Sequence, residues 1–291
     1  MMKQATRLRT VAPMVALGLL VGCGNGDGEP AIPEAPEEMP FDEATAGDVS
    51  GSVLFEGTPP APQIVDMASE PDCAAAYDPD APPTRDLVDV DDAGGLRNVF
   101  VYVKDGLEGM AFPRPADSPV MDQVACRYTP HMVGVMVGQP ITFRNSDGLL
   151  HNINATPQIN RGFNISQPVN MDTERTFAQP EIMIPVRCDV HGWMLGYLGV
   201  LDHPYHAVSS NDGGFDLSTL PPGEYVLEAW HSQLGVQEQT VTVETGETSD
   251  VSFTFTEGML ADAEVPMGEP IHPHFHDPVE RIVGMASGHQ H

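Results

Sequence analysis

The sequence predicts an all-β protein built from two β-sandwiches. Glycine and proline each occur 28 times among the 291 residues. Turn pairs such as Pro-Gly and Asp-Gly interrupt valine-rich, alternating runs roughly every ten residues, which is typical of short strands. Because the chain is longer than a usual single domain, we expect two compact units once the tails are removed.

The first 22 residues have the composition of a secretory signal. Basic residues precede an apolar run over 11–22, which is shorter than the roughly 20 residues that span a bilayer. The run ends in Leu-Val-Gly-Cys23, which resembles the bacterial lipobox. That resemblance implies a lipidated Cys23 as the mature N-terminus, anchored to a membrane of the cell envelope. The alternative is a plain signal peptide with an incidental cysteine.

The net charge of -29 limits the class of partner. With 42 acidic and only 13 basic side chains, the chain lacks the clustered Lys and Arg that bind phosphate backbones. We therefore expect no nucleic acid partner. An acidic surface favours a basic protein partner, in an encounter that salt weakens.

The segments that follow the signal are predicted in order. Residues 23–47 are rich in Pro, Glu and Gly and are expected to form a disordered tether. Residues 48–203 are expected to form the first sandwich. The strands of that sandwich include the β-branched runs near 49–55 and 98–104. Between these two runs, the acidic segment 66–95 is expected to be a surface excursion pinned by Cys73, with at most one helical turn.

The C-terminal part repeats the strand texture on a smaller scale. Four short strands are expected within 204–257, which is enough for a small second sandwich. The remaining residues, 258–291, show no periodicity and are expected to be disordered or draped. His and Met residues recur in this tail (His272, His274, His276, His289, His291, Met259, Met267 and Met285), so capture of metal by the tail is an alternative.

The cysteine count points to a metal ligand. If Cys23 carries lipid, three cysteines remain, and one of three is left over in an oxidising compartment. Cys73 and Cys126 flank one predicted sandwich and are expected to form a disulfide. Cys188, which stands among His and Met residues, is then free to bind a metal.

The motif Cys188-Asp-Val-His191-Gly-Trp-Met194 carries the predicted chemistry. His151 lies 37 residues before Cys188, at the end of a β run. A thiolate stabilises Cu(I), imidazoles suit both oxidation states, and a weak thioether tunes the potential. We therefore predict one type 1 copper ion held by these four residues. Zinc is the main rival metal, but it usually takes Cys and His without methionine.

The same residues carry a family resemblance. The Cys-x2-His-x2-Met loop resembles that of amicyanin and, with a shorter His-to-Met gap, plastocyanin, and His151-Asn152-Ile resembles the upstream ligand segment of these cupredoxins. The resemblance implies a Greek-key sandwich in which Asn152 locks the ligand loop by hydrogen bonds. The C-terminal segment around Leu-Pro-Pro-Gly-Glu-Tyr resembles carboxypeptidase regulatory-like, transthyretin-like domains, which implies a docking or spacing role.

Several other aromatic and histidine residues each have two possible interpretations. Trp193 is expected to shape an exposed copper edge or to act as a hydrophobic plug, and His191 is expected at the surface, where electrons pass. His131 is either a packed histidine or part of a second site. We expect the histidines at 203, 206 and 231 to be structural, with His203 as a competing ligand in the alternative.

Taken together, these features predict an exported electron carrier and not an enzyme. The expected location is the periplasm, outer membrane or cell surface, and the expected partner is a redox protein such as a cytochrome. No small-molecule substrate is expected. The alternatives are copper storage or delivery with the same ligands and, last, a mononuclear copper enzyme, which needs an open coordination position.

Overall fold

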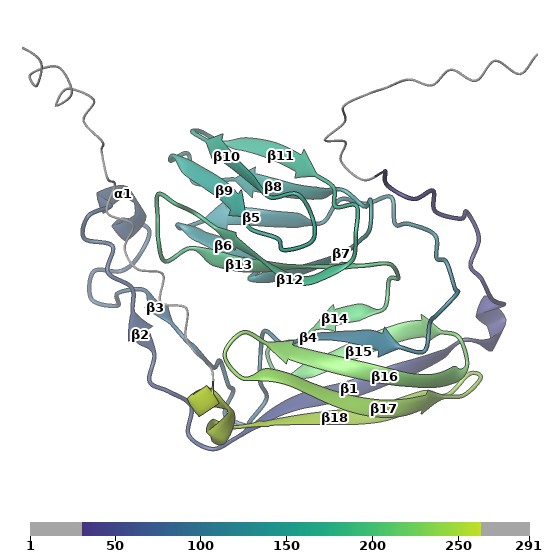
Figure 1. The fold of residues 1–291 in the computed structure, drawn as a ribbon. Coiled ribbons are helices and arrows are strands. Elements are labelled where there is room, and N and C mark those ends of the chain that lie inside the picture. The colour runs from purple at the N-terminus through teal and green to yellow at the C-terminus, as the bar shows by residue number, and fades with distance from the viewer. Residues whose placement is uncertain (1–30, 263–291) are drawn as a thin grey trace, which may run out of the picture. The chain divides into compact units, whose positions relative to one another are not determined.

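Residues 31–262 are described by a computed structural model, and they are almost entirely β (Figure 1). The one α-helix, α1 (Pro71–Ala74), is a single turn, and two 3-10 helices, η1 (Glu43–Thr45) and η2 (Glu257–Asp262), complete the non-strand elements of the described part. The all-β prediction is therefore confirmed. The predicted signal, Cys23 and the tail histidines lie outside the described residues. No helix among the described residues is long and apolar enough to cross a membrane.

The first sandwich pairs a five-stranded sheet with a four-stranded sheet. The sheet orders are β10-β9-β12-β13-β7 and β11-β8-β5-β6. The strands are β5 (Val120–Val124), β6 (Arg127–Thr129), β7 (Met132–Met136), β8 (Ile141–Asn145), β9 (His151–Ala155), β10 (Phe163–Gln167), β11 (Met171–Arg175), β12 (Glu181–Arg187) and β13 (Leu195–Leu201). Buried Ile141, Phe143 and Leu198 belong to the core of this sandwich. That core also contains Cys188 and Met194, so the predicted ligand loop lies against packed apolar side chains.

The second sandwich has sheets of three and four strands. The orders are β15-β1-β18 and β14-β4-β16-β17. The strands are β1 (Gly47–Glu56), β4 (Phe100–Asp105), β14 (His206–Val208), β15 (Gly214–Leu220), β16 (Gly223–His231), β17 (Gly235–Val243) and β18 (Thr248–Thr256). The four C-terminal strands expected within 204–257 correspond to β15 to β18. The core shared by the two sheets consists of Val, Leu, Phe, Tyr, Ala and Met side chains.

Two strands that we expected in the first sandwich belong to the second. β1 runs parallel to β18 and antiparallel to β15, and β4 lies between β14 and β16. The predicted division at residues 48–203 and 204–257 is therefore wrong for these strands. Their alternating apolar side chains, such as Val49, Val53 and Phe55, specify a buried face but not the partner sheet. The first sandwich, from β5 to β13, is inserted between β4 and β14 of the second.

Side chains from both sandwiches form a small shared apolar cluster. Phe100 and Tyr102 of β4 pack there with Met132, Met183 and Leu201 of the first sandwich. Gly199 permits this approach, because a Cβ at that position would lie 2.6 Å from the Phe100 ring. Two packed sandwiches thus give the ligand loop a stiff support.

Segments expected to be unstructured are partly ordered. Met39 and Phe41, in the predicted tether, pack against the core of the second sandwich, and Arg114 Nη2 donates to the carbonyl of Pro33 over 2.8 Å. At the other end, the Met259 sulfur accepts from the backbone N–H of Thr256 at 3.5 Å. The start of the tail therefore packs as part of η2. In both places a few apolar side chains suffice to hold a polar segment onto a β-sheet.

The excursion between β1 and β4 is ordered around one helical turn, as predicted. It contains β2 (Gln63–Ile64), α1 and β3 (Thr84–Arg85), and β2 pairs with β3. The predicted disulfide between Cys73 of α1 and Cys126 is present, with Cα atoms 5.6 Å apart. It ties the excursion to the turn between β5 and β6.

Candidate metal centre

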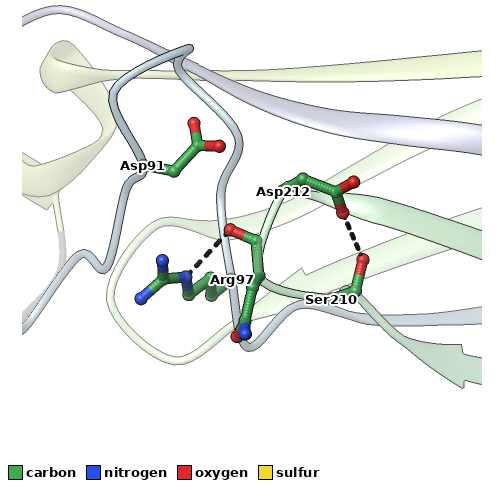
Figure 2. Close-up of a pocket in the computed structure, with 5 residues that line it drawn as sticks. Asp91, Arg97, Ser210 and Asp212 are labelled. Atoms are coloured by element: carbon green, nitrogen blue, oxygen red, sulfur yellow. Dashed lines mark hydrogen bonds between the residues drawn. The ribbon is translucent and has the colours of Figure 1, made fainter.

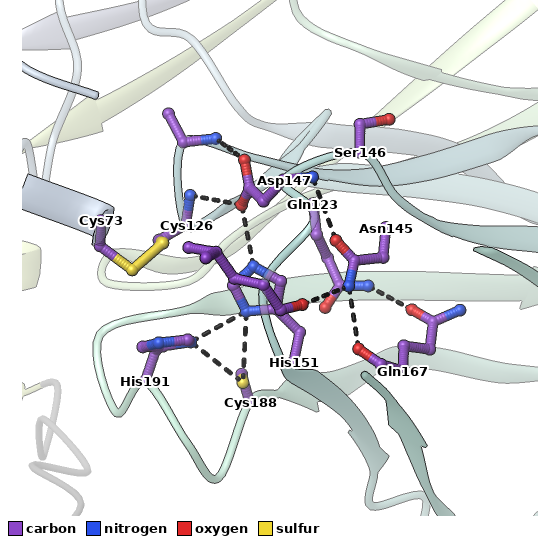
Figure 3. Close-up of polar contacts among 12 residues, drawn as sticks. Cys73, Gln123, Cys126, Asn145, Ser146, Asp147, His151, Gln167, Cys188 and His191 are labelled. Atoms are coloured by element: carbon purple, nitrogen blue, oxygen red, sulfur yellow. Dashed lines mark hydrogen bonds and ion pairs between the residues drawn. A yellow bond between two sulfur atoms is a disulfide. The ribbon is translucent and has the colours of Figure 1, made fainter. Parts of the chain in front are cut away.

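Three of the four predicted ligands converge at one end of the first sandwich (Figure 3). His151 begins β9, whereas Cys188 and His191 lie in the loop that joins β12 to β13. The exposed fractions are 0% for His151 and 2% each for Cys188 and His191. The side chains are therefore removed from bulk water, one on β9 and two in the loop between β12 and β13.

The separations between the ligand atoms suit a single metal ion. His151 Nδ1 lies 2.9 Å from His191 Nδ1, and Cys188 Sγ lies 3.9 Å and 3.7 Å from the same two atoms. The point equidistant from the three atoms is about 2.1 Å from each, close to the metal–nitrogen and metal–sulfur bond lengths of roughly 2.0–2.3 Å known for zinc. One thiolate and two imidazoles are a donor set that copper accepts in both oxidation states. The residues present therefore fit copper.

Backbone hydrogen bonds close the ligand loop on itself. Met194 N donates to His191 O at 2.9 Å, and Cys188 N donates to Met194 O at 3.3 Å. Met194 is 2% exposed and belongs to the core of the first sandwich. These contacts place the Met194 backbone beside Cys188 and His191, and the Met194 sulfur stays the predicted fourth ligand.

The Cys188 sulfur is a buried group with few compensating donors. Burial raises the pKa of the Cys188 thiol, and N–H groups including that of Asn152 oppose this rise. Asn152 N donates to Cys188 Sγ at 3.5 Å. Because the thiolate is the form that binds metal, copper binding here must displace a proton.

The two histidines differ in what lies behind them. Burial and the neighbouring His151 ring lower the pKa of His191 to about 4, so His191 is neutral at pH 7. His151 Nε2 instead donates to Asp147 Oδ2 at 2.8 Å, which orients the ring so that Nδ1 faces Cys188. Each ring therefore directs its Nδ1 atom to the same point.

Asp147 is a functional residue that the sequence analysis did not identify. Its carboxylate accepts from the backbone N–H of Ala125 at 2.6 Å and from that of Cys126 at 2.8 Å, in addition to His151. It therefore couples the orientation of the His151 ring to the β5–β6 turn. The available signal was an acidic residue four positions before a predicted histidine ligand, within the turn sequence Asn-Ser-Asp-Gly.

Asn152 ties the ligand loop to β9 through Asp189. Asn152 Oδ1 accepts from Asp189 N at 2.6 Å, and Asn152 Nδ2 donates to Asp189 Oδ2 at 3.0 Å. Asn154 and Asn164 also donate to the Asp189 carboxylate; burial raises the pKa of Asp189, but the asparagine hydrogen bonds outweigh it and lower the pKa. The family resemblance pointed to Asn152 alone; the other three members of this cluster had no sequence signal.

Buried amides support the turn that leads to His151. Asn145 Nδ2 donates to the carbonyls of Leu149 and Gln167, and the side chains of Gln123 and Gln167 hydrogen bond to each other (Figure 3). Gln123, Asn145 and Gln167 are each at most 1% exposed. Because buried amides require partners, this network fixes the register of the strands around the site.

His191 is covered, contrary to the expectation that it lies at the surface. Glu70 Oε2 lies 3.8 Å from His191 Nε2, and the Cys73 and Cys126 sulfurs lie within 4.8 Å of a His191 ring nitrogen. Trp193 packs on His191 with ring centroids 5.3 Å apart and donates from Nε1 to Cys126 O at 3.0 Å. The excursion pinned by the disulfide is the physical reason for the cover.

The remaining sequence-predicted histidines pack away from the ligands. His131 contacts Tyr197 edge to face, His206 stacks on Phe100, and the Nδ1 atoms of His203 and His231 accept backbone N–H groups. No group of three potential metal ligands in residues 31–262 includes any of them. Their placement agrees with structural roles.

A surface depression of about 700 Å³ lies apart from the predicted ligands (Figure 2). It is lined by Asp91, Arg97, Ser210, Asn211 and Asp212. Arg97 Nε donates to Asn211 O, and Ser210 Oγ donates to Asp212 Oδ1. These hydrogen bonds organise two turns, and no predicted ligand lines the depression.

Comparison with known proteins finds similarity only among solved structures. No protein family and no curated protein matches the chain. Similar structures include a Cu-containing nitrite reductase from Thermus scotoductus SA-01, an oxidised amicyanin variant and a purple cupredoxin from Nitrosopumilus maritimus. Their identities are 19%, 19% and 22%, and their TM-scores are 0.28, 0.26 and 0.25.

These similarities are partial. They cover 35%, 34% and 29% of this chain, and 25%, 89% and 99% of the respective structures. The match thus spans about a quarter of the nitrite reductase but most of the two small cupredoxins. Because the TM-scores are this low, these structures support no conclusion about function. Such a conclusion has to rest on the geometry of the ligand atoms.

Proposed function

We propose that this chain is a type 1 copper protein that carries single electrons. The observation that carries the proposal is the convergence of Cys188 Sγ with the Nδ1 atoms of His151 and His191, all buried at the end of a β-sandwich. When bound, copper supplies a one-electron couple between Cu(I) and Cu(II). Met194 is the proposed weak axial ligand.

The chain's own residues keep the site in one geometry. Asp147 orients the His151 ring, Asn152 fixes the loop through Asp189, and the sheet core immobilises Cys188. The protein holds the ligands in one geometry that suits both oxidation states of copper. Little structural reorganisation therefore accompanies electron transfer. Burial also keeps water from an open coordination position.

We also propose a class of partner and a location for the protein. The acidic surface suits a basic redox partner such as a cytochrome, and Cys23 suits a lipid anchor in the cell envelope. Because His191 is covered, we propose that the partner contacts the exposed part of the loop, where Val190 is 40% exposed. The second sandwich, with its resemblance to carboxypeptidase regulatory-like domains, serves as a spacer or docking unit.

Spectroscopy tests the proposal. The copper-loaded protein is expected to show an intense visible thiolate-to-copper band and a narrow copper hyperfine pattern in the EPR spectrum. Both features are expected to vanish in Cys188→Ser, whereas Ser166→Ala, an exposed change on β10, is expected to retain them. A wild-type protein that binds copper without either feature contradicts the electron-carrier proposal.

Copper storage or delivery uses the same ligands and differs in exchange rate. The three ligands are at most 2% exposed, which favours retention of copper over its release. An electron carrier is expected to keep its copper during challenge with a Cu(I) chelator, whereas a delivery protein surrenders it readily. The same burial ranks a copper enzyme last, because substrate needs access to an open position.

A further inference from the structure

A second set of soft metal ligands lies on the far side of His191. The sulfurs of Cys73 and Cys126 and a ring nitrogen of His191 are all within 4.8 Å of one another. Cys73 and Cys126 are each 1% exposed, and His191 is 2% exposed. Figure 3 shows the disulfide on one side of the His191 ring and Cys188 on the other.

The two nitrogens of His191 face different surroundings. Nδ1 lies 2.9 Å from His151 Nδ1 and 3.7 Å from Cys188 Sγ, so it belongs to the predicted copper centre. Nε2 faces the cover, 3.8 Å from the Glu70 carboxylate. A neutral imidazole has one lone pair, so His191 serves one ion at a time: through Nδ1 at the first centre or, with the proton on Nδ1, through Nε2 on the cover side.

As a disulfide, the two sulfurs are poor ligands, but as thiolates they are ligands that Cu(I) prefers. Reduction needs two electrons and two protons, which a dithiol supplies as it closes to its own disulfide. With Cα atoms 5.6 Å apart, both sulfurs stay within reach of one ion bound at roughly 2.3 Å from each. We propose that reduction of the Cys73–Cys126 disulfide creates a second Cu(I) site from the two thiolates and His191.

Contacts independent of the disulfide hold half of this site in place. Asp147 accepts from Cys126 N, Trp193 donates to Cys126 O, and Tyr77 Oη donates to Ala125 O at 2.7 Å. Cys73 sits on the single turn α1, so its position adapts more easily than that of Cys126. Cu(I) binding then releases the thiol protons, and the carboxylate of Glu70 lies beside the cationic ion.

A copper ion held by the two thiolates lies against the same imidazole that serves the first centre. The second site therefore provides a position from which copper enters or leaves that centre under reducing conditions. Its existence does not depend on whether the first centre carries electrons.

Copper counting in matched variants tests the second site. The background is the full chain with Cys23→Ser and Cys188→Ser, which removes the first thiolate ligand and leaves only the Cys73–Cys126 pair. This protein is treated with a phosphine reductant or left oxidised, then equilibrated with Cu(I) in the presence of a chromophoric chelator. The control adds Cys73→Ser and Cys126→Ser, which removes the cross-link without supplying thiolates.

The reduced background is expected to retain one more Cu(I) per chain than the oxidised background, and the control is expected to show no gain on reduction. Copper X-ray absorption of the added ion is expected to show two sulfur neighbours and a nitrogen. Equal retention in the oxidised and reduced proteins overturns the proposal, as does an equal gain in the control. Loss of the folded circular dichroism spectrum on reduction also overturns it, because the site requires the folded contact with His191. None of these outcomes depends on the visible band of Cys188, so the two proposals fail separately.

Discussion

The two sandwiches differ in what they bury. Inside the first lie the amides and imidazoles around the ligands, including Gln123, Asn145, Gln167 and His151, each at most 1% exposed. The second buries fewer polar side chains, among them Ser209, Glu228 and His231, around a core that includes Val49, Leu227 and Phe253. One fold class, with similar strands and turns, therefore supports two kinds of interior.

The two kinds of interior contribute differently to stability and to the geometry of the site. Buried polar groups gain little net stability even when hydrogen bonded, but they fix positions and orientations. Buried apolar area contributes stability without specifying a ligand geometry. The first sandwich positions the metal ligands, and the second adds packing.

The largest expected effect is a core truncation in the second sandwich. Phe253 is fully buried, so Phe253→Ala is expected to lower the free energy of unfolding by about 3–5 kcal/mol. The exposed change Val236→Ala on β17 serves as the control and is expected to cost less than about 0.5 kcal/mol. Urea denaturation measures both. If Phe253→Ala also shifts the visible copper band of the folded protein, the claim that the second sandwich adds stability without shaping the metal site is wrong.

The next effect is on stability at acid pH. Burial and the nearby His131 ring lower the pKa of His231 from an ordinary 6.5 to about 4. Because the unfolded chain binds this proton first, the stabilisation is complete above pH 6.5 and is lost as pH falls toward 4. The expected loss is about 3 kcal/mol for this residue.

The variant His231→Asn keeps an acceptor for the N–H groups of Gln233 and Leu234 but does not titrate in this range. Metal-free wild type and variant are compared by urea unfolding at several pH values between 7 and 4. A shallower pH dependence in the variant supports the assignment, and identical slopes refute it.

The smallest of the three effects concerns the carboxylate behind His151. Asp147→Ala removes the acceptor for His151 Nε2 and for two backbone N–H groups, so copper affinity is expected to fall about 10-fold to 100-fold. Competition with a chelator of known affinity measures the change. Asp172→Ala, which removes an exposed partner of Arg144, is the matched control and is expected to leave the affinity unchanged. Equal losses in both variants show that Asp147 has no specific role.

Local sequence features pointed to the three side chains that converge in the structure but not to the groups that surround them. The Cys188 to Met194 spacing, the upstream His151 and the odd cysteine count all act within one loop or through composition, so they are readable without a fold. The cover over His191 and the contacts of Asp147 depend on how residues 70–77 and the turn near Cys126 pack in three dimensions. No local pattern encodes that packing.

The same limit explains the error in domain organisation. The alternation in β1 correctly predicted a half-buried strand, yet β1 pairs with β15 and β18, which lie far away in the sequence. A buried apolar face fits either sandwich equally well, and only the complete set of partners decides between them. The inserted arrangement of the first sandwich was therefore beyond a residue-by-residue reading.

The central claim is that Cys188, His151 and His191 hold one copper ion. A crystal structure of the copper-loaded protein, with anomalous diffraction recorded at the copper absorption edge, tests it most directly. The account predicts a copper peak bonded to Cys188 Sγ and to the Nδ1 atoms of His151 and His191, with the Cys73–Cys126 disulfide intact. A copper peak elsewhere, with the Cys188 sulfur unbound, contradicts it.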